Sequence, residues 1–271
     1  MREKRKKSKR QRVMPVLPNL FTTGNLFCGL LSIMASIEIV VAVSGGEASQ
    51  EWVFRRFWWA GAFIVISAFL DMMDGKLARF FNHESKFGLS YDSLSDLVSF
   101  GVAPAVLIYT WVLMGSGKIG LMAVLFYVVC TALRLARFNV QSGNEERFHF
   151  TGLPSPAAAG LMIAPVMLLT ALSIMPDSKV VWYFLFAAPV IGLLMVSSVE
   201  YTKRPYINLG GPFNALVVAA IIFAAIITHP EIMFIFIVYL YAIVGLVVYA
   251  IKQLRGRSKL TDEAQTPEGH S

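Results

Sequence analysis

The chain has 271 residues, of which 56% are hydrophobic and only 15% are charged, and its mean hydropathy is +0.62. Soluble domains of this size carry about 25% charged residues, so the composition excludes an ordinary soluble enzyme and indicates lipid as the solvent. The net charge of +7 is concentrated at the N-terminus, where eight of the first twelve residues are Lys or Arg. A basic run directly before an apolar segment favours an anionic membrane surface, so we expect no nucleic-acid partner.

Apolar runs long enough to cross a bilayer, which takes about 20 residues, recur along the whole chain. Turn signals such as Gly115-Ser116-Gly117 and Gly210-Gly211-Pro212 separate these runs. The sequence predicts eight spanning helices, at residues 19–42, 57–80, 88–114, 119–139, 155–176, 180–198, 212–229 and 231–252. We therefore predict an all-α, polytopic membrane helix bundle, with a basic juxtamembrane segment at 1–18, one transmembrane domain at 19–252 and a polar tail at 253–271.

The basic residues fall on one side of such an eight-helix bundle. Of the 24 Lys and Arg residues, all but Arg55, Arg56, Lys118 and Lys179 lie in segments on the side of the N-terminus. By the positive-inside rule that side is cytoplasmic. We expect a multi-pass protein of the cell (inner) membrane with both termini in the cytoplasm.

Four aspartates stand at the ends of predicted spans, where an ionisable residue is costly and marks function by default. Asp71 and Asp74 lie three positions apart near the end of the second span, and Asp92 and Asp96 lie four apart near the start of the third. Each spacing puts a pair on one helix face, and the short link makes the two helices antiparallel neighbours. We expect the four carboxylates to converge near the cytoplasmic boundary of the bilayer.

Four acids cannot share a half-buried site unless some are protonated or cations bind. Ligands that are all oxygen, with no His or Cys, favour Mg²⁺, Mn²⁺ or Ca²⁺ over zinc. Paired metals bridged by carboxylates are common in phosphoryl chemistry, so we expect two ions of Mg²⁺ or Mn²⁺. The alternative is a structural ion-pair cluster with Lys76, Arg79 and Lys86, which would not need four carboxylates on two helix faces.

The residues around the aspartates fit a site that a ligand approaches closely. Gly75 follows Asp74 within a helix, where glycine costs about 1 kcal/mol relative to alanine, and close approach to the backbone is a reason for it. Ala78 is small and keeps the same face open, and Gly88 can play the role of Gly75 on the next span. The guanidinium of Arg79 suits a phosphate.

Together these residues form the pattern D-x2-D-G-x2-A-R-x8-G-x3-D-x3-D over residues 71–96. It resembles the signature of the CDP-alcohol phosphotransferase family, with every position filled. The resemblance implies transfer of a phosphatidyl group from a CDP-activated lipid to a small alcohol, a core of six helices with the active site open to the cytoplasm, and a homodimer. It also implies that the metal ligands are Asp71, Asp74, Asp92 and Asp96, and that Asp96 is also the general base. Three small residues would line the binding site of the cytidine: Gly75, Ala78 and Gly88. Arg79 would support the carboxylates or the diphosphate.

The end of the fourth span suggests the acceptor. Arg134 and Arg137 lie three positions apart on one face, and Arg is the natural partner of a carboxylate or a phosphate. The tract from Arg134 to Asn139, with GLPSPAAAG at 152–160, is similar to the bacterial and archaeal phosphatidylserine synthase branch of the family, which implies CDP-diacylglycerol and L-serine as substrates. We expect Arg134, Arg137 and Asn139 to line the acceptor site. Glycerol 3-phosphate, inositol and choline stay open as other acceptors, although choline would favour an aromatic cage.

The start of the first span carries a polar stripe. Asn19 and Thr22 lie one turn apart at the cytoplasmic end, and either helix capping or binding of the nucleotide explains them.

A cation transporter is the main alternative class, because intramembrane aspartates also mark ion paths. Transporters of that kind have two related halves with broken helices, whereas this sequence shows no internal repeat and gathers its four aspartates within residues 71–96. A structural lipid-binding protein would not need the four carboxylates.

Overall fold

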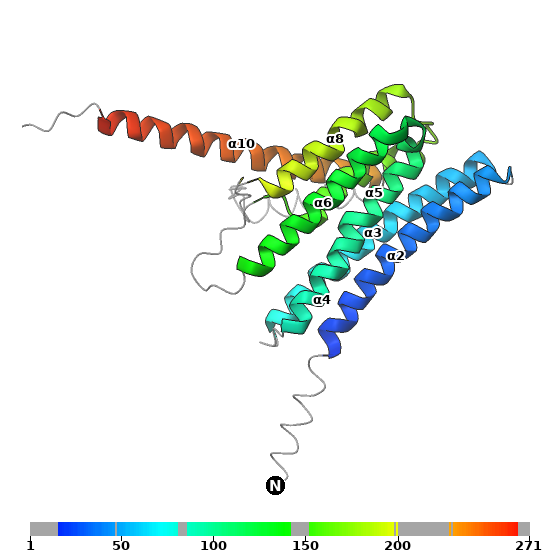
Figure 1. Cartoon of the computed structure of the whole chain (residues 1–271), viewed down its shortest axis with the longest axis horizontal. Helices are drawn as coiled ribbons and strands as arrows, with labels where there is room; N and C mark the ends of the chain where they lie inside the picture. The colour runs from blue at the N-terminus through cyan, green and yellow to red at the C-terminus, as the bar shows by residue number, and fades with distance from the viewer. Residues whose placement is uncertain are drawn as a thin grey trace, which may run out of the picture.

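The computed structural model describes residues 16–46, 48–80, 86–141, 152–197, 199, 228 and 230–264, and the side chains of 19–46, 48–76, 87–140, 152–197, 199, 228 and 230–250. The predicted span at 212–229 therefore lies almost entirely outside the described residues. The described elements are all helical, as the composition predicts (Figure 1). In chain order they are α2 (Val16–Ser44), α3 (Gln50–Phe80), α4 (Lys86–Asp96), η1 (Leu97–Val102), α5 (Ala103–Ile108), η2 (Tyr109–Leu113), η3 (Met114–Ser116), α6 (Gly117–Gln141), α7 (Ser155–Ala171), α8 (Ser178–Val196) and α10 (Pro230–Ala264).

The described part of the chain is a multi-pass membrane bundle. Five of its helical stretches are long and apolar enough to cross a membrane: Asn19–Ser44, Gln50–Lys76, Phe87–Val140, Ser178–Val196 and Pro230–Ala250. The stretch Phe87–Val140 turns at Gly117, where φ is +60°, and α6 packs back against α4 and η1. It therefore supplies both of the spans predicted at 88–114 and 119–139.

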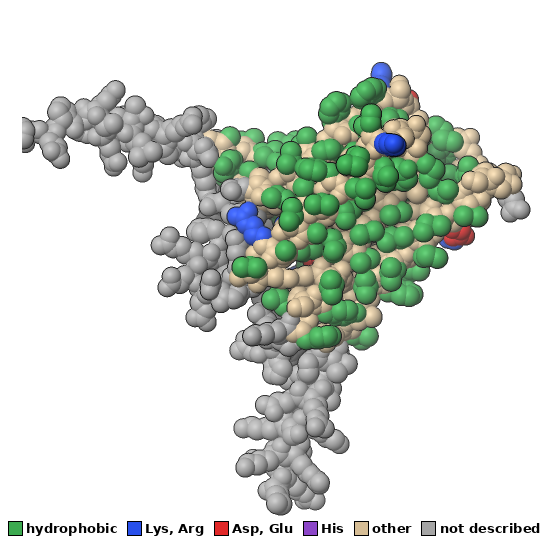
Figure 2. Space-filling model, in the orientation of Figure 1, with side chains coloured by type: hydrophobic (Ala, Val, Ile, Leu, Met, Phe, Trp, Pro, Cys, Tyr) green, Lys and Arg blue, Asp and Glu red, His purple; other side chains and the backbone are tan. Residues whose placement is uncertain are grey.

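Apolar side chains cover the outside of this bundle. Figure 2 shows them over most of the visible face, with the few Lys and Arg side chains of that face near its margins. On α2, for example, Phe27, Met34 and Val41 are all exposed. Such a surface would be insoluble in water, and it matches the hydrocarbon of a bilayer.

The helix that follows α4 lies at the centre of the bundle. Its η1 segment has π-helical hydrogen bonding and contacts α2, α3, α6 and α7. The hydroxyl of Tyr127 in α6 donates a 2.7 Å hydrogen bond to the carbonyl oxygen of Phe100 in η1, and both residues are fully buried. π-helical turns are rare and frequently occur at functional sites. Here the π-helical turn begins one residue after Asp96.

Small residues let the helices approach closely around this centre. A Cβ atom on Gly29 of α2 would lie 2.8 Å from the Cα atom of Ser99 in η1. Gly160 of α7 likewise packs against Val238 of α10. Close packing through small residues is typical of membrane helices, where there is no hydrophobic driving force between helices.

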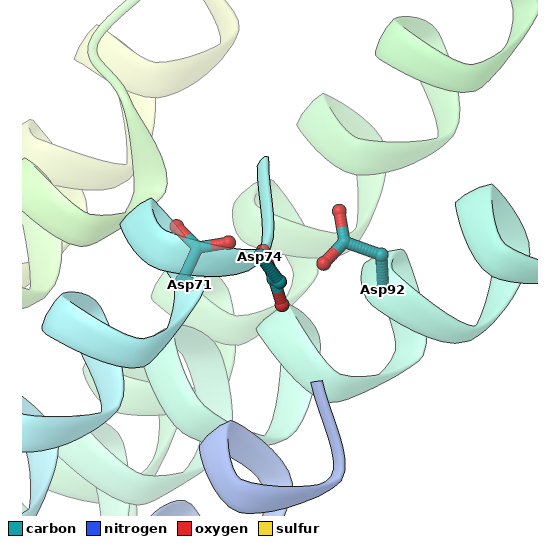
Figure 3. A group of neighbouring side chains, drawn as sticks. All are labelled: Asp71, Asp74 and Asp92. Carbon is teal, nitrogen blue, oxygen red and sulfur yellow. The ribbon is translucent and has the colours of Figure 1, made fainter. Parts of the chain in front are cut away.

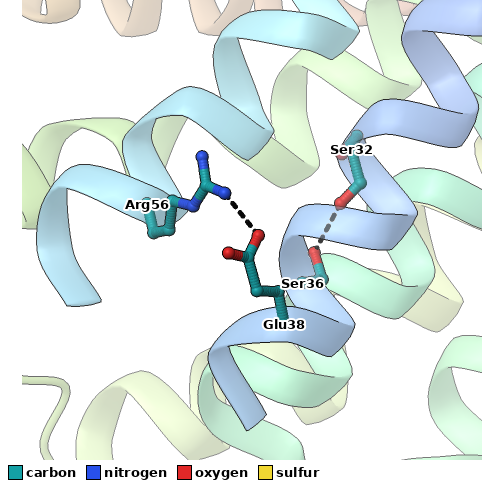
Figure 4. A network of polar contacts seen from close by, with 4 residues as sticks. All are labelled: Ser32, Ser36, Glu38 and Arg56. Atoms are coloured by element: carbon teal, nitrogen blue, oxygen red, sulfur yellow. Dashed lines mark hydrogen bonds and ion pairs between the residues drawn. The ribbon is translucent and has the colours of Figure 1, made fainter. Parts of the chain in front are cut away.

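The α2–α3 pair is held at its far end by a second set of polar contacts. Figure 4 shows Arg56 of α3 paired with Glu38 of α2, and the Ser36 hydroxyl donating to the Ser32 carbonyl oxygen at 2.9 Å. Glu38 lies sixteen positions beyond Thr22 in one continuous helix, which corresponds to about 24 Å. This ion pair is therefore remote from the aspartates.

Candidate active site

Three of the four predicted aspartates form one cluster. Asp71 and Asp74 extend from α3 and Asp92 from α4, and Figure 3 shows their carboxylates facing a common space. One carboxylate oxygen from each residue lies within 4.8 Å of the other two. Helix α2 packs against both α3 and α4, and α3 contacts η1 at the end of α4, so the acids of the two helices converge as the sequence predicts.

Asp96 lies next to this cluster and contacts it through Asp71. The side chains of Asp71 and Asp96 are within hydrogen-bonding distance of each other. Asp96 is only 8% exposed, and the Nδ2 of Asn25 donates a 3.0 Å hydrogen bond to its Oδ1. The fourth aspartate is thus shared between the cluster and α2.

Helix α2 supplies a polar lining that the motif does not include. The hydroxyl of Thr22 donates a 3.0 Å hydrogen bond to Oδ2 of Asp74, which is 5% exposed. The Ser95 hydroxyl of α4 donates to the carbonyl oxygen of Thr22, also at 3.0 Å. Hydrogen bonds of this kind fix the rotamers of carboxylates that would otherwise repel one another. Three helices therefore build the site.

The cluster fits an oxygen-bound divalent cation. Two oxygen ligands on opposite sides of a Mg²⁺ ion lie about 4.2 Å apart, twice the metal–oxygen distance, so small side-chain rotations would let all three acids share one ion. Within the described residues, Oδ1 of Asp92 is buried and has no hydrogen-bond partner, which suits a ligand atom. The aspartate cluster thus agrees with the requirement for divalent cations that the sequence motif implies.

A purely structural ion-pair cluster is less consistent with this geometry. In the part of the chain that the structure describes, the single salt bridge joins Arg56 and Glu38, at the far end of the bundle. Lys76 is exposed. The side chains of Arg79 and Lys86 lie outside the described residues, so their predicted contacts with the acids stay predictions.

The structure describes some of the predicted nucleotide-binding residues and leaves others outside the described side chains. A Cβ atom on Gly75 would meet no described atom within 4 Å, so the backbone beside Asp74 is open to a ligand. Gly88 lies in the first turn of α4, and the side chains of Ala78 and Arg79 lie outside the described residues. The carbonyl oxygen of Asn19 accepts a 2.7 Å hydrogen bond from Thr23, one turn along α2. Thr22 is directed to an aspartate through its hydroxyl.

The predicted acceptor residues lie near the C-terminal end of α6. Arg134 lies close enough to Asp71 and Asp96 to interact with both electrostatically, and its Nη1 donates a 2.9 Å hydrogen bond to the hydroxyl of Ser155. Among the described residues its Nε is buried without a hydrogen-bond partner. Ser155 begins α7 and belongs to the GLPSPAAAG tract, so the two sequence segments that suggested the acceptor meet in space.

Arg137 and Asn139 lie farther along the same helix. Arg137 is exposed, and its Nη1 donates to the Val196 carbonyl oxygen of α8 at 3.4 Å. Oδ1 of Asn139 accepts a 2.9 Å hydrogen bond from Ser93, the residue after Asp92. The same Ser93 hydroxyl also lies 3.1 Å from the carbonyl oxygen of Leu89, so this contact ties Asn139 to α4.

The sequence analysis missed the support that α2 and α3 give to Asp96. Asn25 is fully buried in an apolar span and lies one turn from Thr22, and Ser67 is buried one turn before Asp71. A polar residue inside a spanning helix is a functional signal in its own right, and this rule could have selected Asn25. Ser67 gives no such signal, because serine is common at packed membrane helix interfaces.

Comparisons with known proteins point to the same family as the motif around the site. A family model described as CDP-alcohol phosphatidyltransferase matches residues 15–196. A protein of Helicobacter pylori (strain ATCC 700392 / 26695) named CDP-diacylglycerol–serine O-phosphatidyltransferase is 35% identical over 188 residues, covering 69% of this chain and 71% of its own length. Proteins of the same name from Mycobacterium leprae (strain TN) and Methanocaldococcus jannaschii are 32% and 37% identical, covering 83% and 52% of this chain and 72% and 63% of their own lengths.

Proposed function

The chain belongs to the CDP-alcohol phosphatidyltransferase family, and from that premise we propose that it transfers the phosphatidyl group of CDP-diacylglycerol to the hydroxyl of L-serine and releases CMP. The observation that carries the proposal is the cluster of Asp71, Asp74 and Asp92 at the ends of two apolar helices. A diphosphate attached to a lipid must be bound at the edge of a bilayer, and carboxylates that hold divalent cations suit it. Serine as the acceptor rests on the three relatives described above.

We propose two ions, Mg²⁺ or Mn²⁺, as the cofactor, held by Asp71, Asp74, Asp92 and Asp96. The bound ions would neutralise the diphosphate and stabilise the charge that develops on the departing CMP. The all-oxygen donor set and the unpartnered Oδ1 of Asp92 support this assignment. Gly75, Ala78 and Gly88 would line the cytidine, with Asn19 and Thr22 on the facing end of α2 and Arg79 beside the diphosphate.

The chemical step is a displacement at the phosphorus that carries the diacylglycerol. The serine hydroxyl oxygen forms the new bond to phosphorus, and the bond from phosphorus to the oxygen bridging to CMP breaks with its electron pair leaving on CMP. The serine hydroxyl proton passes to a carboxylate oxygen of Asp96, the proposed general base. Asp96 is suited to this role because it is buried at the edge of the cluster and one of its oxygens is already held by Asn25.

Serine would be bound through its carboxylate. Arg134 is the better placed of the two arginines, since it lies within electrostatic range of Asp71 and Asp96 and its Nε is buried without a partner among the described residues. Asn139, which bonds to Ser93 next to Asp92, would add its amide group to the acceptor site. Arg137 would act at the outer margin, where the acceptor enters.

The proposed location is the cell (inner) membrane, with the active site and both termini in the cytoplasm. The asymmetry of Lys and Arg along the sequence supports this orientation. In this assignment residues 1–18 lie on the cytoplasmic membrane surface, 19–252 form the catalytic domain and 253–271 form a cytoplasmic tail. A homodimer, which the family resemblance implies, is part of the same proposal and can be checked by the mass of the purified protein in a membrane mimetic.

The direct test of function is an acceptor panel. Purified protein is given CDP-diacylglycerol, Mn²⁺ or Mg²⁺, and labelled serine, glycerol 3-phosphate, inositol or choline, and CMP and labelled lipid are measured. The proposal predicts CMP release and lipid labelling with serine. Activity with another alcohol alone would refute the acceptor, and no activity with any of them would refute the reaction.

A chiral phosphorus in the substrate separates two versions of the step. Single in-line displacement inverts the configuration, whereas a covalent phosphatidyl-enzyme passes through two displacements and retains it. We propose the single displacement, and a product of retained configuration would exclude it.

A further inference from the structure

Asn25 is a fully buried polar residue beside the acids, and it makes contacts with three different helical segments. Its Nδ2 donates to Oδ1 of Asp96 at 3.0 Å. Its Oδ1 accepts a hydrogen bond from the hydroxyl of Ser67 in α3. Its own carbonyl oxygen accepts a 3.0 Å hydrogen bond from Ser99 in η1. Asn25, Ser67 and Ser99 are all fully buried.

The bond from Ser67 determines what Asn25 can offer. A serine hydroxyl that donates to the amide oxygen leaves only the NH₂ group to face Asp96. A carboxyl oxygen of Asp96 accepts a hydrogen bond from that group. Ser67, Asn25 and Asp96 therefore form a chain of hydrogen bonds that runs from α3 through α2 to α4, and the Ser67 hydroxyl also lies 3.4 Å from the carbonyl oxygen of Asn25.

The same contacts fix α2 in depth and rotation. Gly29 lies one turn after Asn25, and its Cα approaches Ser99 so closely that a Cβ would overlap with the Ser99 hydroxyl and backbone. The Ser99 hydroxyl at that contact is the one that bonds to Asn25. Asn25 is thus fixed through both its side chain and its backbone, so its amide group keeps its position relative to α3 and η1.

Asp96 needs such a support because its other neighbours are acids. It interacts electrostatically with Asp71, Asp92 and Asp74, and the single basic group near it is Arg134 within the described side chains. Repulsion alone would rotate Asp96 away from the cluster. A fixed neutral donor from α2 offsets this repulsion and introduces no charge that would compete with a bound cation.

We propose that Asn25 is a positioning residue for the transfer reaction, and that Ser67 acts through it. The amide holds Oδ1 of Asp96, so that the second oxygen of Asp96 faces the ion and the serine hydroxyl. This inference rests on the proposed function, since it assigns Asp96 the roles of ligand and base. Neither Asn25 nor Ser67 belongs to the D-x2-D…D-x3-D motif.

The test uses the full-length protein in nanodiscs and two substitutions. Asn25→Leu keeps the approximate volume of the side chain and removes the donor, and Ser67→Ala removes the group that orients the amide. Two quantities are measured in each variant: kcat for CMP release, normalised to folded protein, and Mn²⁺ affinity by electron paramagnetic resonance in the presence of CDP. Loss of a residue that hydrogen-bonds to a metal ligand typically lowers affinity or activity about 10–100-fold, and we expect losses in that range for Asn25→Leu.

Controls separate positioning from loss of structure. Ser36→Ala removes a fully buried hydroxyl farther along α2 that bonds to Ser32, and it should leave both quantities unchanged. Ser67→Thr retains a hydroxyl and should restore most of what Ser67→Ala loses. The double variant Asn25→Leu/Ser67→Ala should be no worse than Asn25→Leu, because Ser67 acts only through the amide.

The possible results are distinct. An unchanged kcat or an unchanged Mn²⁺ affinity in folded Asn25→Leu would overturn the proposal, as would independent, multiplying losses in the double variant. If Asn25→Leu did not fold, the comparison of Ser67→Ala with Ser67→Thr would decide in the same way. Failure of the wild-type protein to use serine would instead refute the proposed acceptor, and the same variants would then be judged with the alcohol it does use and by Mn²⁺ affinity.

Discussion

Thr22 in α2 and Asp74 in α3 are joined by a 3.0 Å hydrogen bond across 52 positions of sequence. The carbonyl oxygen of Thr22 accepts a second bond, from Ser95 in α4. One residue at the start of α2 thus contacts both helices that carry the acids. The spatial relation between the two aspartate pairs depends on α2 as well as on the short link between α3 and α4.

Replacing Thr22 with valine tests this dependence. The variant keeps the shape of the side chain but leaves Oδ2 of Asp74 without its donor, so the carboxylate can rotate away from the ion. We expect a loss of about tenfold in apparent Mn²⁺ affinity, in the range typical for removing a hydrogen-bond partner of a metal ligand. CMP release measured across a Mn²⁺ titration reports the change. Thr110→Val is the matched control, since the Thr110 hydroxyl bonds to carbonyl oxygens of its own helix, and equal effects in both variants would contradict the role of Thr22.

Replacing Asp92 with asparagine tests the cluster itself. Asparagine keeps the size of the side chain and removes the negative charge, so the ion loses a carboxylate ligand from α4. We expect the rate of CMP release to fall by at least ~100-fold, because removing a direct metal ligand lowers activity more than removing a residue that hydrogen-bonds to a ligand. Glu38→Gln removes an acid at the far end of α2 and should retain activity. Activity of Asp92→Asn within a few-fold of wild type would exclude Asp92 as a ligand.

Alanine substitutions of two glycines on neighbouring helices should change the melting temperature differently. Gly29→Ala would force a Cβ to 2.8 Å from the Ser99 Cα, and overpacking of this kind typically costs about 1–3 kcal/mol, so its melting temperature should fall. Gly75→Ala meets no described atom and gains about 1 kcal/mol of helix propensity, so its melting temperature should not fall. If cytidine packs on the backbone there, the KM for CDP-diacylglycerol rises in Gly75→Ala. A normal KM in that variant would remove Gly75 from the nucleotide site.

The two arginines of α6 should differ in their effect on serine. Arg134 lies within electrostatic range of Asp71 and Asp96, whereas Arg137 is exposed and contacts α8. We expect Arg134→Gln to raise the serine KM by ~10-fold or more, consistent with the loss of a charged hydrogen bond, and Arg137→Gln to raise it less. Initial rates across a serine titration at saturating CDP-diacylglycerol give both values. The reverse order would place the serine carboxylate at the outer margin of the site.

Much of the fold could be predicted from the sequence because membrane helices leave a strong pattern. Long apolar runs and glycine-containing turns located the described spans, including the turn at Gly117 that separates α6 from the helix before it. The convergence of Asp71, Asp74 and Asp92 followed from helical spacing and a short connection. These features are determined by residues close together in the sequence, and residue spacing is sufficient to predict them.

The missing part of the site depends on how helices rotate against one another. Asn25 and Ser67 meet because α2 and α3 pack closely along their length, and the spacing within either helix does not determine that rotation. The π-helical turn at η1 also has no sequence signal of its own, yet it follows Asp96 directly and accepts the Tyr127 hydroxyl at Phe100. Long-range partners of this kind require the assembled structure.

The most direct test of the account is the position of Mn²⁺ in an experimental structure of the protein with CDP. Anomalous diffraction at the manganese edge locates the ion independently of the surrounding atoms. We predict a peak among the carboxylates of Asp71, Asp74 and Asp92, at roughly the 2.0–2.2 Å expected for hard cations of this size and within reach of the CDP diphosphate. A structure with CDP bound and Mn²⁺ in excess that showed no peak at these carboxylates would contradict the central claim.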